Sequence, residues 1–141
     1  MKTSKLRIVL DTNVLIVSLP SHLKYHWIFE RLIQGHYELF VSNEILTEYQ
    51  EQIARRYGLS YTEAQLDFLL LLPNVALVTP FYRWQLIPED PDDNKFVDCA
   101  VAANVDYIVT NDKHFRVLRN LAFPPVRTVT LQEFEALLTS A

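Results

Sequence analysis

Short apolar segments alternate along the chain with longer segments that repeat apolar residues at helical spacing. The short segments predict five strands, at 6–10, 37–41, 75–79, 107–110 and 126–130. Helical spacing predicts helices at about 22–34, 43–57, 60–72, 91–104 and 131–138. Such alternation is typical of a three-layer α/β/α fold, in which a mostly parallel five-stranded sheet has helices on both faces.

The ends of the predicted helices carry residues that helix termini favour. Ser42 is placed as an N-cap, and so is Asp90, which Pro91 follows at the first helical position. Gly35 and Gly58 follow helical segments where a C′ residue is expected. They are the only two glycines, so none is left for a phosphate-binding loop. A P-loop and a dinucleotide-binding fingerprint are therefore excluded.

Composition indicates a single domain over residues 1–141, with a mass of 16.5 kDa. The net charge of −4 means that any nucleic-acid binding requires a local basic patch. One cysteine, Cys99, excludes an internal disulfide and fits a reducing compartment. The N-terminus starts with basic residues, but Asp11 and Asn13 interrupt its apolar run, so it is a poor signal peptide. We expect a cytoplasmic protein without a membrane span.

Two acids lie at the carboxyl ends of predicted strands. Asp11 follows the first strand and opens a segment, 11–13, that is expected to be a polar turn. Asp112 follows the fourth strand. In parallel α/β sheets, sites form outside the carboxyl ends of strands, so these two acids are expected at one edge.

Helical phase adds two more acids. Asp93 shares a face with the apolar residues of helix 91–104, and a carboxylate aimed inward must find a partner. Glu48 is the acid nearest the apolar face of helix 43–57. The other acids at the start of helix 91–104, Asp90 and Asp92, are explained by capping and the helix dipole.

Each of the four acids also has a structural explanation when taken singly. Asp11 and Asp112 are common turn residues, and Glu48 is compatible with a solvated helix face. Their joint placement at one edge favours a shared role. Four convergent carboxylates repel one another unless they take up protons or bind a cation. Oxygen donors select a hard ion, Mg²⁺ or Mn²⁺, and the scattered histidines form no zinc pattern: His22, His26, His36 and His114.

The sequence resembles the PIN domain family of small metal-dependent nucleases along its whole length. Four segments carry the resemblance: LDTNVLI at 10–16, SNEILTEY at 42–49, DPDDNKFVDCA at 90–100 and DYIVTND at 106–112. Each motif is short, but their order and spacing together are specific. The variety it is most similar to supplies toxins of bacterial toxin–antitoxin systems.

The resemblance implies metal binding by Asp11, Glu48, Asp93 and Asp112, with Asn13 and Thr110 as polar helpers. It also implies an RNA substrate, a homodimer and an antitoxin partner. The expected reaction is phosphodiester hydrolysis by a metal-activated water. Three basic residues after Asp112 are expected either to contact substrate phosphates or to form an ordinary basic surface: Lys113, Arg116 and Arg119.

Two other functions are compatible with an acidic pocket. An aspartyl phosphatase usually has a second acid two residues after its nucleophile, but Asn13 occupies that position here. A receiver-like or other non-catalytic binding module is the second alternative. A receiver usually has an acid after a central strand, whereas the predicted third strand ends in Thr79 and Pro80.

Overall fold

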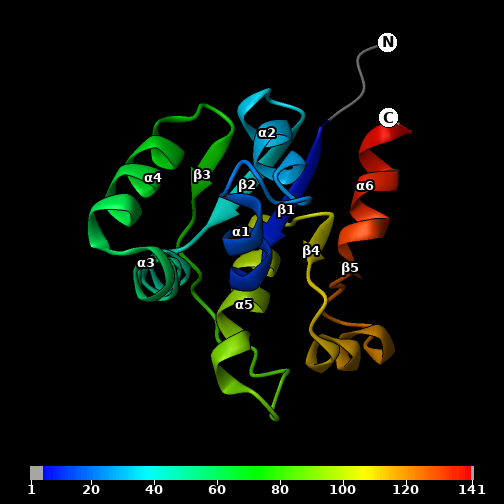
Figure 1. Cartoon of the computed structure of the whole chain (residues 1–141). Coiled ribbons are helices and arrows are strands. Elements are labelled where there is room, and N and C mark those ends of the chain that lie inside the picture. The colour runs from blue at the N-terminus through cyan, green and yellow to red at the C-terminus, as the bar shows by residue number, and fades with distance from the viewer. Residues whose placement is uncertain (1–4, 141) are drawn as a thin grey trace.

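The computed structural model describes residues 5–140 and contains a five-stranded sheet in the order β3-β2-β1-β4-β5 (Figure 1). All neighbouring strands are parallel, which confirms the predicted α/β class. The strands are β1 (Leu6–Leu10), β2 (Tyr37–Val41), β3 (Val75–Leu77), β4 (Tyr107–Val109) and β5 (Thr128–Val129). Residues 1–4, the start of the segment judged above to be a poor signal peptide, lie outside the described residues.

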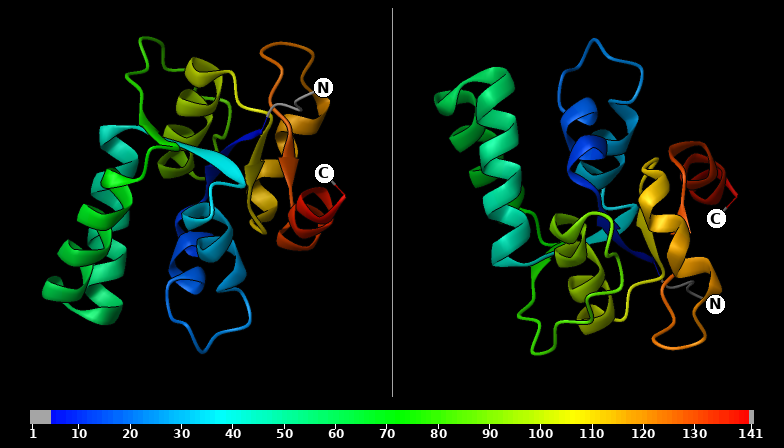
Figure 2. Two further views of the ribbon diagram at one scale, coloured as in Figure 1. Left: turned by 90° about the horizontal axis from the view of Figure 1, so that it is seen from above. Right: turned by 90° about the horizontal axis from the view of Figure 1, so that it is seen from below.

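Helices cover both faces of this sheet (Figure 2). They are α1 (Thr12–Ser18), α2 (Trp27–Ile33), α3 (Asn43–Tyr57), α4 (Leu59–Leu71), α5 (Asn94–Ala103) and α6 (Leu131–Thr139), with 3-10 helices η1 (Pro91–Asp93) and η2 (Lys113–Asn120). On one face α2 meets α6 through Trp27 and Phe134, whose ring centroids are 5.8 Å apart. On the other face α5 meets η2 through Phe96 and Phe115, at 6.4 Å. No helix within residues 5–140 has the length and apolar character that crossing a membrane requires.

The central strands are buried on both sides. Ile8, Val9 and Leu10 of β1 have no exposed surface, nor do Ile108 and Val109 of β4. Strands buried on both faces have continuous apolar sequences, which is why these two segments are recognisable without alternation.

Most predicted helix ends are confirmed. The Ser42 hydroxyl accepts a hydrogen bond from the Ile45 N–H at 3.2 Å. Thr130 and Glu133 form a reciprocal capping box at the start of α6. Gly35 has a φ of +78° and Gly58 a φ of +89°, values that residues with a Cβ rarely adopt.

Four helix starts differ from the prediction, and one of them is the helix expected from residue 91, which begins as the 3-10 helix η1 and continues as α5 from Asn94. The expected polar turn at 11–13 is wrong, because α1 begins at Thr12. This short helix buries most of its side chains, so it has no polar face that would produce helical periodicity. The helix expected from residue 22 begins at Trp27, and the helix expected from residue 60 begins at Leu59 as α4. The edge strands β3 and β5 are also shorter than predicted.

Candidate functional site

The order of the strands creates a crevice between β1 and β4. From β1 the chain continues towards β2 on one side, whereas from β4 it continues towards β5 on the other. Neighbouring parallel strands whose connections leave in opposite directions form a topological switch point, and ligands bind outside the carboxyl ends there. Asp11 follows β1 and Thr110 follows β4. The Asp11 N–H donates to the carbonyl of Val109 at 3.1 Å, which fixes the two strand ends together.

Asp11 lies at the bottom of the crevice and is only 6% exposed. Its Oδ2 accepts a hydrogen bond from the Thr110 hydroxyl at 2.8 Å. The same hydroxyl oxygen accepts from the Asp112 N–H at 3.0 Å, so Thr110 connects the two acids. Burial raises the pKa of Asp11 to about 6, the hydrogen bond from Thr110 opposes this rise, and the charges of Asp112 and Glu48 add to it.

Asp93 reaches the same region from η1. It is 8% exposed, and its Oδ2 is buried without a hydrogen-bond partner among residues 5–140. The pKa of Asp93 is raised to about 8, first by burial and then by the charges of Asp11, Asp90 and Asp112. Asp93 is thus turned inward, as the phase of the helix predicted, and offers an oxygen within 4.8 Å of one from Asp112.

Glu48 approaches from α3, and both of its carboxylate oxygens have partners. Oε2 accepts a hydrogen bond from the Thr12 hydroxyl. Oε1 lies 2.6 Å from the ammonium of Lys95 on α5, in a pair whose side chains are 16% and 19% exposed. Nothing in the sequence pattern pointed to Lys95. A mostly buried acid paired in this way is held in a fixed orientation beside Asp11.

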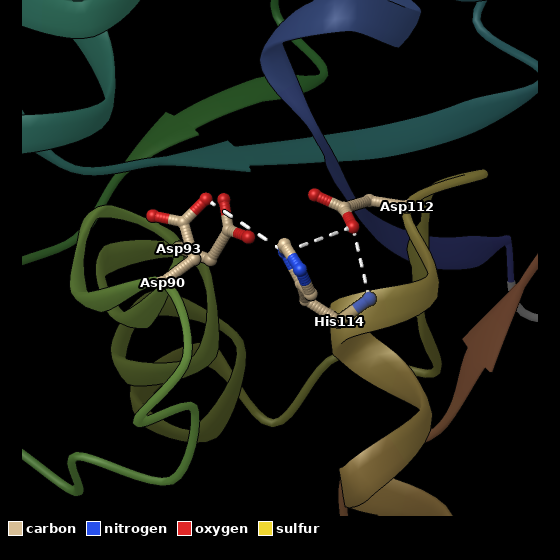
Figure 3. Close-up of side chains that lie close together, drawn as sticks. All are labelled: Asp90, Asp93, Asp112 and His114. Atoms are coloured by element: carbon tan, nitrogen blue, oxygen red, sulfur yellow. Dashed lines mark hydrogen bonds and ion pairs between the residues drawn. The ribbon is translucent and has the colours of Figure 1, made fainter.

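A second group of ligand atoms lies at the mouth of the crevice. Asp90, Asp93, Asp112 and His114 each contribute one atom to a set whose members all lie within 4.8 Å of one another (Figure 3). The Asp112 Oδ1 also accepts from the His114 N–H at 2.9 Å, so this acid caps η2 as well. Asp90 likewise acts as a cap, because its Oδ1 accepts from the Asp92 N–H at 3.2 Å. Asp90 and Asp112 therefore cap helices and also lie close to the other acids.

Sequence reasoning missed Asp90 and His114 as members of this group. Asp90 has a sufficient local explanation as a cap, and His114 was counted among scattered histidines. The available signal was spacing, since Asp90 precedes Asp93 by three residues and His114 follows Asp112 by two. The sequence predicted oxygen donors alone, whereas one imidazole, that of His114, lies among these carboxylates.

The donors present fit a divalent cation. The buried Oδ2 of Asp93 has no hydrogen-bond partner within the described part of the chain, and buried polar atoms are normally paired. Asp90 and Asp112 each offer a carboxylate oxygen within 4.8 Å of one that Asp93 offers. A cation there would both pair Asp93 and offset the repulsion among its neighbours.

The family model for the PIN domain matches residues 7–114. This chain belongs to the PIN domain family. The matched residues include all four acids that the sequence motifs indicated. A comparison with curated proteins found no match.

The fold of this PIN domain is similar to two solved structures. One is the crystal structure of VapBC2 from Rickettsia felis bound to a DNA fragment from their promoter, with a TM-score of 0.60, 19% identity, and coverage of 89% of this chain and 98% of that chain. The other is the PIN domain of T. brucei RRP44, with a TM-score of 0.56, 14% identity, and coverage of 96% of this chain and 82% of that chain. At such identities the likeness shows the fold.

The remaining predicted residues lie around the acids of this PIN domain. Asn13 is exposed and lines a hollow of ≈ 340 Å³ together with Asp11 and Asp112. The basic residues of η2 are all exposed and border a smaller hollow beside Asp112 and Thr110: Lys113, Arg116 and Arg119. A locally basic surface therefore adjoins the acids, although the chain as a whole is acidic.

Proposed function

We propose that this PIN domain is a metal-dependent endoribonuclease that hydrolyses RNA with Mg²⁺ or Mn²⁺. The observation that carries the proposal is the crevice at the switch point, where the buried carboxylates of Asp11 and Asp93 lie close to Asp112. Membership of the PIN domain family supports a nuclease, and the family resemblance supports RNA as its substrate.

Four acids would hold the cation or its bound waters: Asp11, Glu48, Asp93 and Asp112. A cation bound there lowers the pKa of a water molecule and offsets charge on the phosphate. Asp11 follows β1 directly, and Asp112 caps η2 three residues after the end of β4, so we propose these two acids as the anchors of the site. Glu48 has both oxygens engaged by Thr12 and Lys95, so its proposed role is to orient the attacking water from a fixed position. Thr110 supports Asp11 through its hydroxyl.

The RNA backbone is proposed to approach along η2. Lys113, Arg116 and Arg119 are exposed on this helix, and basic side chains contact phosphates without reading the sequence. Asn13 lines the hollow of ≈ 340 Å³ together with Asp11 and Asp112, and its proposed role is to contact the nucleotide that enters this hollow.

The geometry favours neither of the two alternatives, an aspartyl phosphatase and a receiver-like or other non-catalytic binding module. A phosphatase nucleophile must be accessible to substrate, whereas Asp11 is 6% exposed and hydrogen-bonded to Thr110. A receiver-like module does not require a second set of convergent ligands such as that at the mouth of the crevice.

We further propose that the protein is the toxin of a toxin–antitoxin pair, acts in the cytoplasm and forms a homodimer. The fold likeness to VapBC2 supports an antitoxin partner. The helix α4 leaves apolar side chains exposed, which supports a protein partner at that surface: Leu59, Phe68, Leu70 and Leu71.

The test is cleavage of a single-stranded RNA by purified protein in Mg²⁺ or Mn²⁺. Cleavage is expected to stop in chelator and to return when the metal is restored. Asp93→Asn should lower the rate by at least about 100-fold, because loss of a group in an outer shell alone costs about 10–100-fold. The matched control is Asp67→Asn, an exposed acid on α4, which should cleave as fast as wild type. Equal cleavage by Asp93→Asn and wild type would show a contaminating nuclease and leave the proposal without support.

A further inference from the structure

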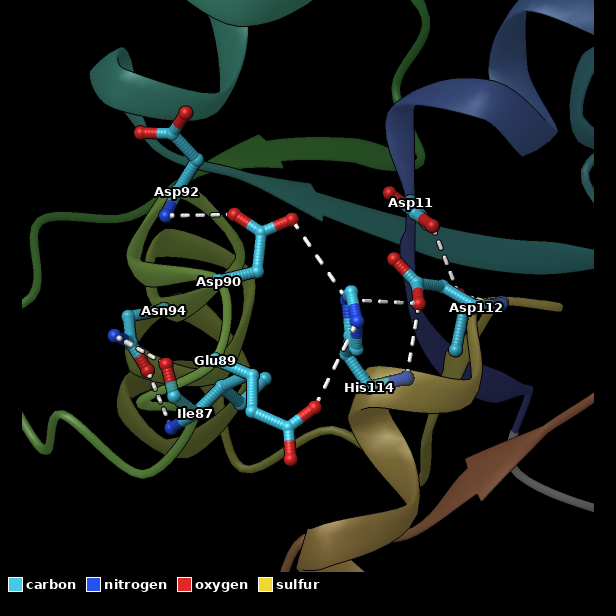
Figure 4. A network of polar contacts seen from close by, with 9 residues as sticks. Asp11, Ile87, Glu89, Asp90, Asp92, Asn94, Asp112 and His114 are labelled. Atoms are coloured by element: carbon cyan, nitrogen blue, oxygen red, sulfur yellow. Dashed lines mark hydrogen bonds and ion pairs between the residues drawn. The ribbon is translucent and has the colours of Figure 1, made fainter.

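The imidazole of His114 lies between carboxylates that come from two different segments (Figure 4). Its Nδ1 is 3.3 Å from Asp112 Oδ1 and 3.9 Å from Asp90 Oδ2. Its Nε2 faces the other way and lies 3.7 Å from Glu89 Oε2. The two ring nitrogens therefore have different surroundings, one facing the acidic cluster and the other a single exposed carboxylate.

Two buried atoms in this cluster lack hydrogen-bond partners among residues 5–140: His114 Nδ1 and Asp93 Oδ2. Asp93 is itself 8% exposed, so its unpaired oxygen is not simply turned towards water. Unpaired buried polar atoms are uncommon in folded proteins, and each one requires an explanation. Both atoms belong to residues of the set within 4.8 Å, and an ion between them would satisfy both at once.

The surroundings of Nε2 support the same explanation. A histidine that binds a metal through one ring nitrogen almost always presents the other to a carboxylate, a carbonyl or water, which fixes the tautomer and the ring orientation. Here the exposed carboxylate of Glu89 lies on that side of the ring, with Oε2 3.7 Å from Nε2. An ordinary surface histidine needs neither a buried Nδ1 nor a carboxylate on each side of its ring.

We propose that His114 and Asp90 complete a mixed nitrogen–oxygen cation site with Asp93 and Asp112, and that this site prefers a first-row transition metal over Mg²⁺. Imidazole ligands suit transition metals, whereas Mg²⁺ prefers oxygen donors and retains several waters. Glu89 acts as a positioning residue that orients the ring. The inference rests on the proposed function only in taking Asp93 and Asp112 as cation ligands.

The test is metal binding by the full-length protein after treatment with chelator. Calorimetric titration with Mn²⁺ and with Mg²⁺ gives the two affinities, and pulsed electron paramagnetic resonance of bound Mn²⁺ detects a directly bonded imidazole nitrogen. Wild type is expected to bind Mn²⁺ more tightly than Mg²⁺ and to show the nitrogen coupling. His114→Ala should lose the coupling and weaken Mn²⁺ binding by about 10–100-fold, with a smaller effect on Mg²⁺.

Three further variants define the site. His114→Gln removes the nitrogen ligand but keeps a polar side chain. It should also lose the nitrogen coupling and bind Mn²⁺ more weakly, and it replaces His114→Ala in the test if the alanine variant folds poorly. Glu89→Gln should keep the nitrogen coupling and weaken Mn²⁺ binding by less than His114→Ala does. His22→Ala, which removes an exposed histidine between α1 and α2, should bind both metals as wild type does.

Bound Mn²⁺ without nitrogen coupling in wild type would overturn the inference and leave His114 as a neighbour of the acids that binds no metal. Unchanged Mn²⁺ affinity in both His114 variants would overturn it as well. RNA cleavage is measured in parallel. If the inference alone fails, wild type still cleaves RNA with metal. If the proposed function alone fails, wild type shows the nitrogen coupling but cleaves no RNA.

Discussion

At the scale of single residues, Asp93 combines burial with nearby like charges. Its pKa is raised from 3.8 to about 8, first by burial and then by Asp11, Asp90 and Asp112. The folded state therefore binds this proton more tightly than the unfolded state does. Its contribution to stability is present below the unfolded pKa and is lost as the pH rises through the folded value. The pKa of Asp11, raised to about 6, acts in the same direction over a lower range.

We therefore expect the metal-free protein to lose stability between about pH 6 and about pH 9. Asp93→Asn has no proton to lose at this position, so its free energy of unfolding should fall less over that range. Urea denaturation in chelator at the two pH values measures the difference. The free energy of unfolding of Asp67→Asn should change with pH as that of wild type does. If the free energy of unfolding of Asp93→Asn fell by as much as that of wild type, Asp93 would not be the cause of the loss.

At the scale of elements, η2 begins at an acid with two functions. Asp112 Oδ1 accepts the His114 N–H at 2.9 Å and so caps η2, and the same carboxylate belongs to the acidic cluster. A neutral amide keeps the acceptor oxygen but removes the charge, whereas alanine removes both. The two substitutions therefore separate the capping role from the electrostatic role.

Without metal, Asp112→Asn is expected to be as stable as wild type or more stable, because a repelling charge is lost. Asp112→Ala should be less stable than Asp112→Asn by about 1 kcal/mol, the usual cost of removing a cap. Thermal melts with and without Mg²⁺ test this. Mg²⁺ should raise the melting temperature of wild type more than that of either variant, since only native-state binding stabilises. If Asp112→Asn were clearly less stable than wild type without metal, the charge of Asp112 would itself stabilise the fold.

At the scale of the whole molecule, the acidic crevice and the exposed apolar side chains lie on different elements. The crevice lies at the carboxyl ends of β1 and β4, whereas Phe68, Leu70 and Leu71 are exposed on α4. A surface of this kind fits a protein partner. Catalysis and association should therefore respond to different substitutions.

For the proposed homodimer, light scattering after size exclusion should give twice the chain mass of 16.5 kDa. If α4 contributes to the dimer, Leu71→Lys should shift the mass towards that of the monomer. The same variant should keep wild-type affinity for Mn²⁺, because α4 supplies no ligand to the cluster. A monomeric wild type over a wide concentration range would contradict the homodimer and would leave α4 as a candidate surface for the antitoxin.

The sequence by itself determined the fold class, the family and the bounds of β1, β2 and α3. Parallel central strands bury both faces, so they have continuous apolar sequences, and caps such as Ser42 act within one turn of chain. The sequence also placed Asp11 and Asp112 at strand ends and turned Asp93 inward, because periodicity fixes direction within an element. The metal roles of these acids remain predictions.

Only the tertiary structure decided which side chains from distant segments meet. Lys95 pairs with Glu48 across 47 residues of sequence, and Thr12 reaches the same acid from 36 residues away. Asp90 and His114 have sufficient local explanations as a cap and as a polar surface residue, so no pattern separates them from ordinary residues. Their proximity depends on how η1 and η2 pack beside β4. Secondary-structure periodicity records direction within an element, but the distance between elements is set by the packing of the whole core.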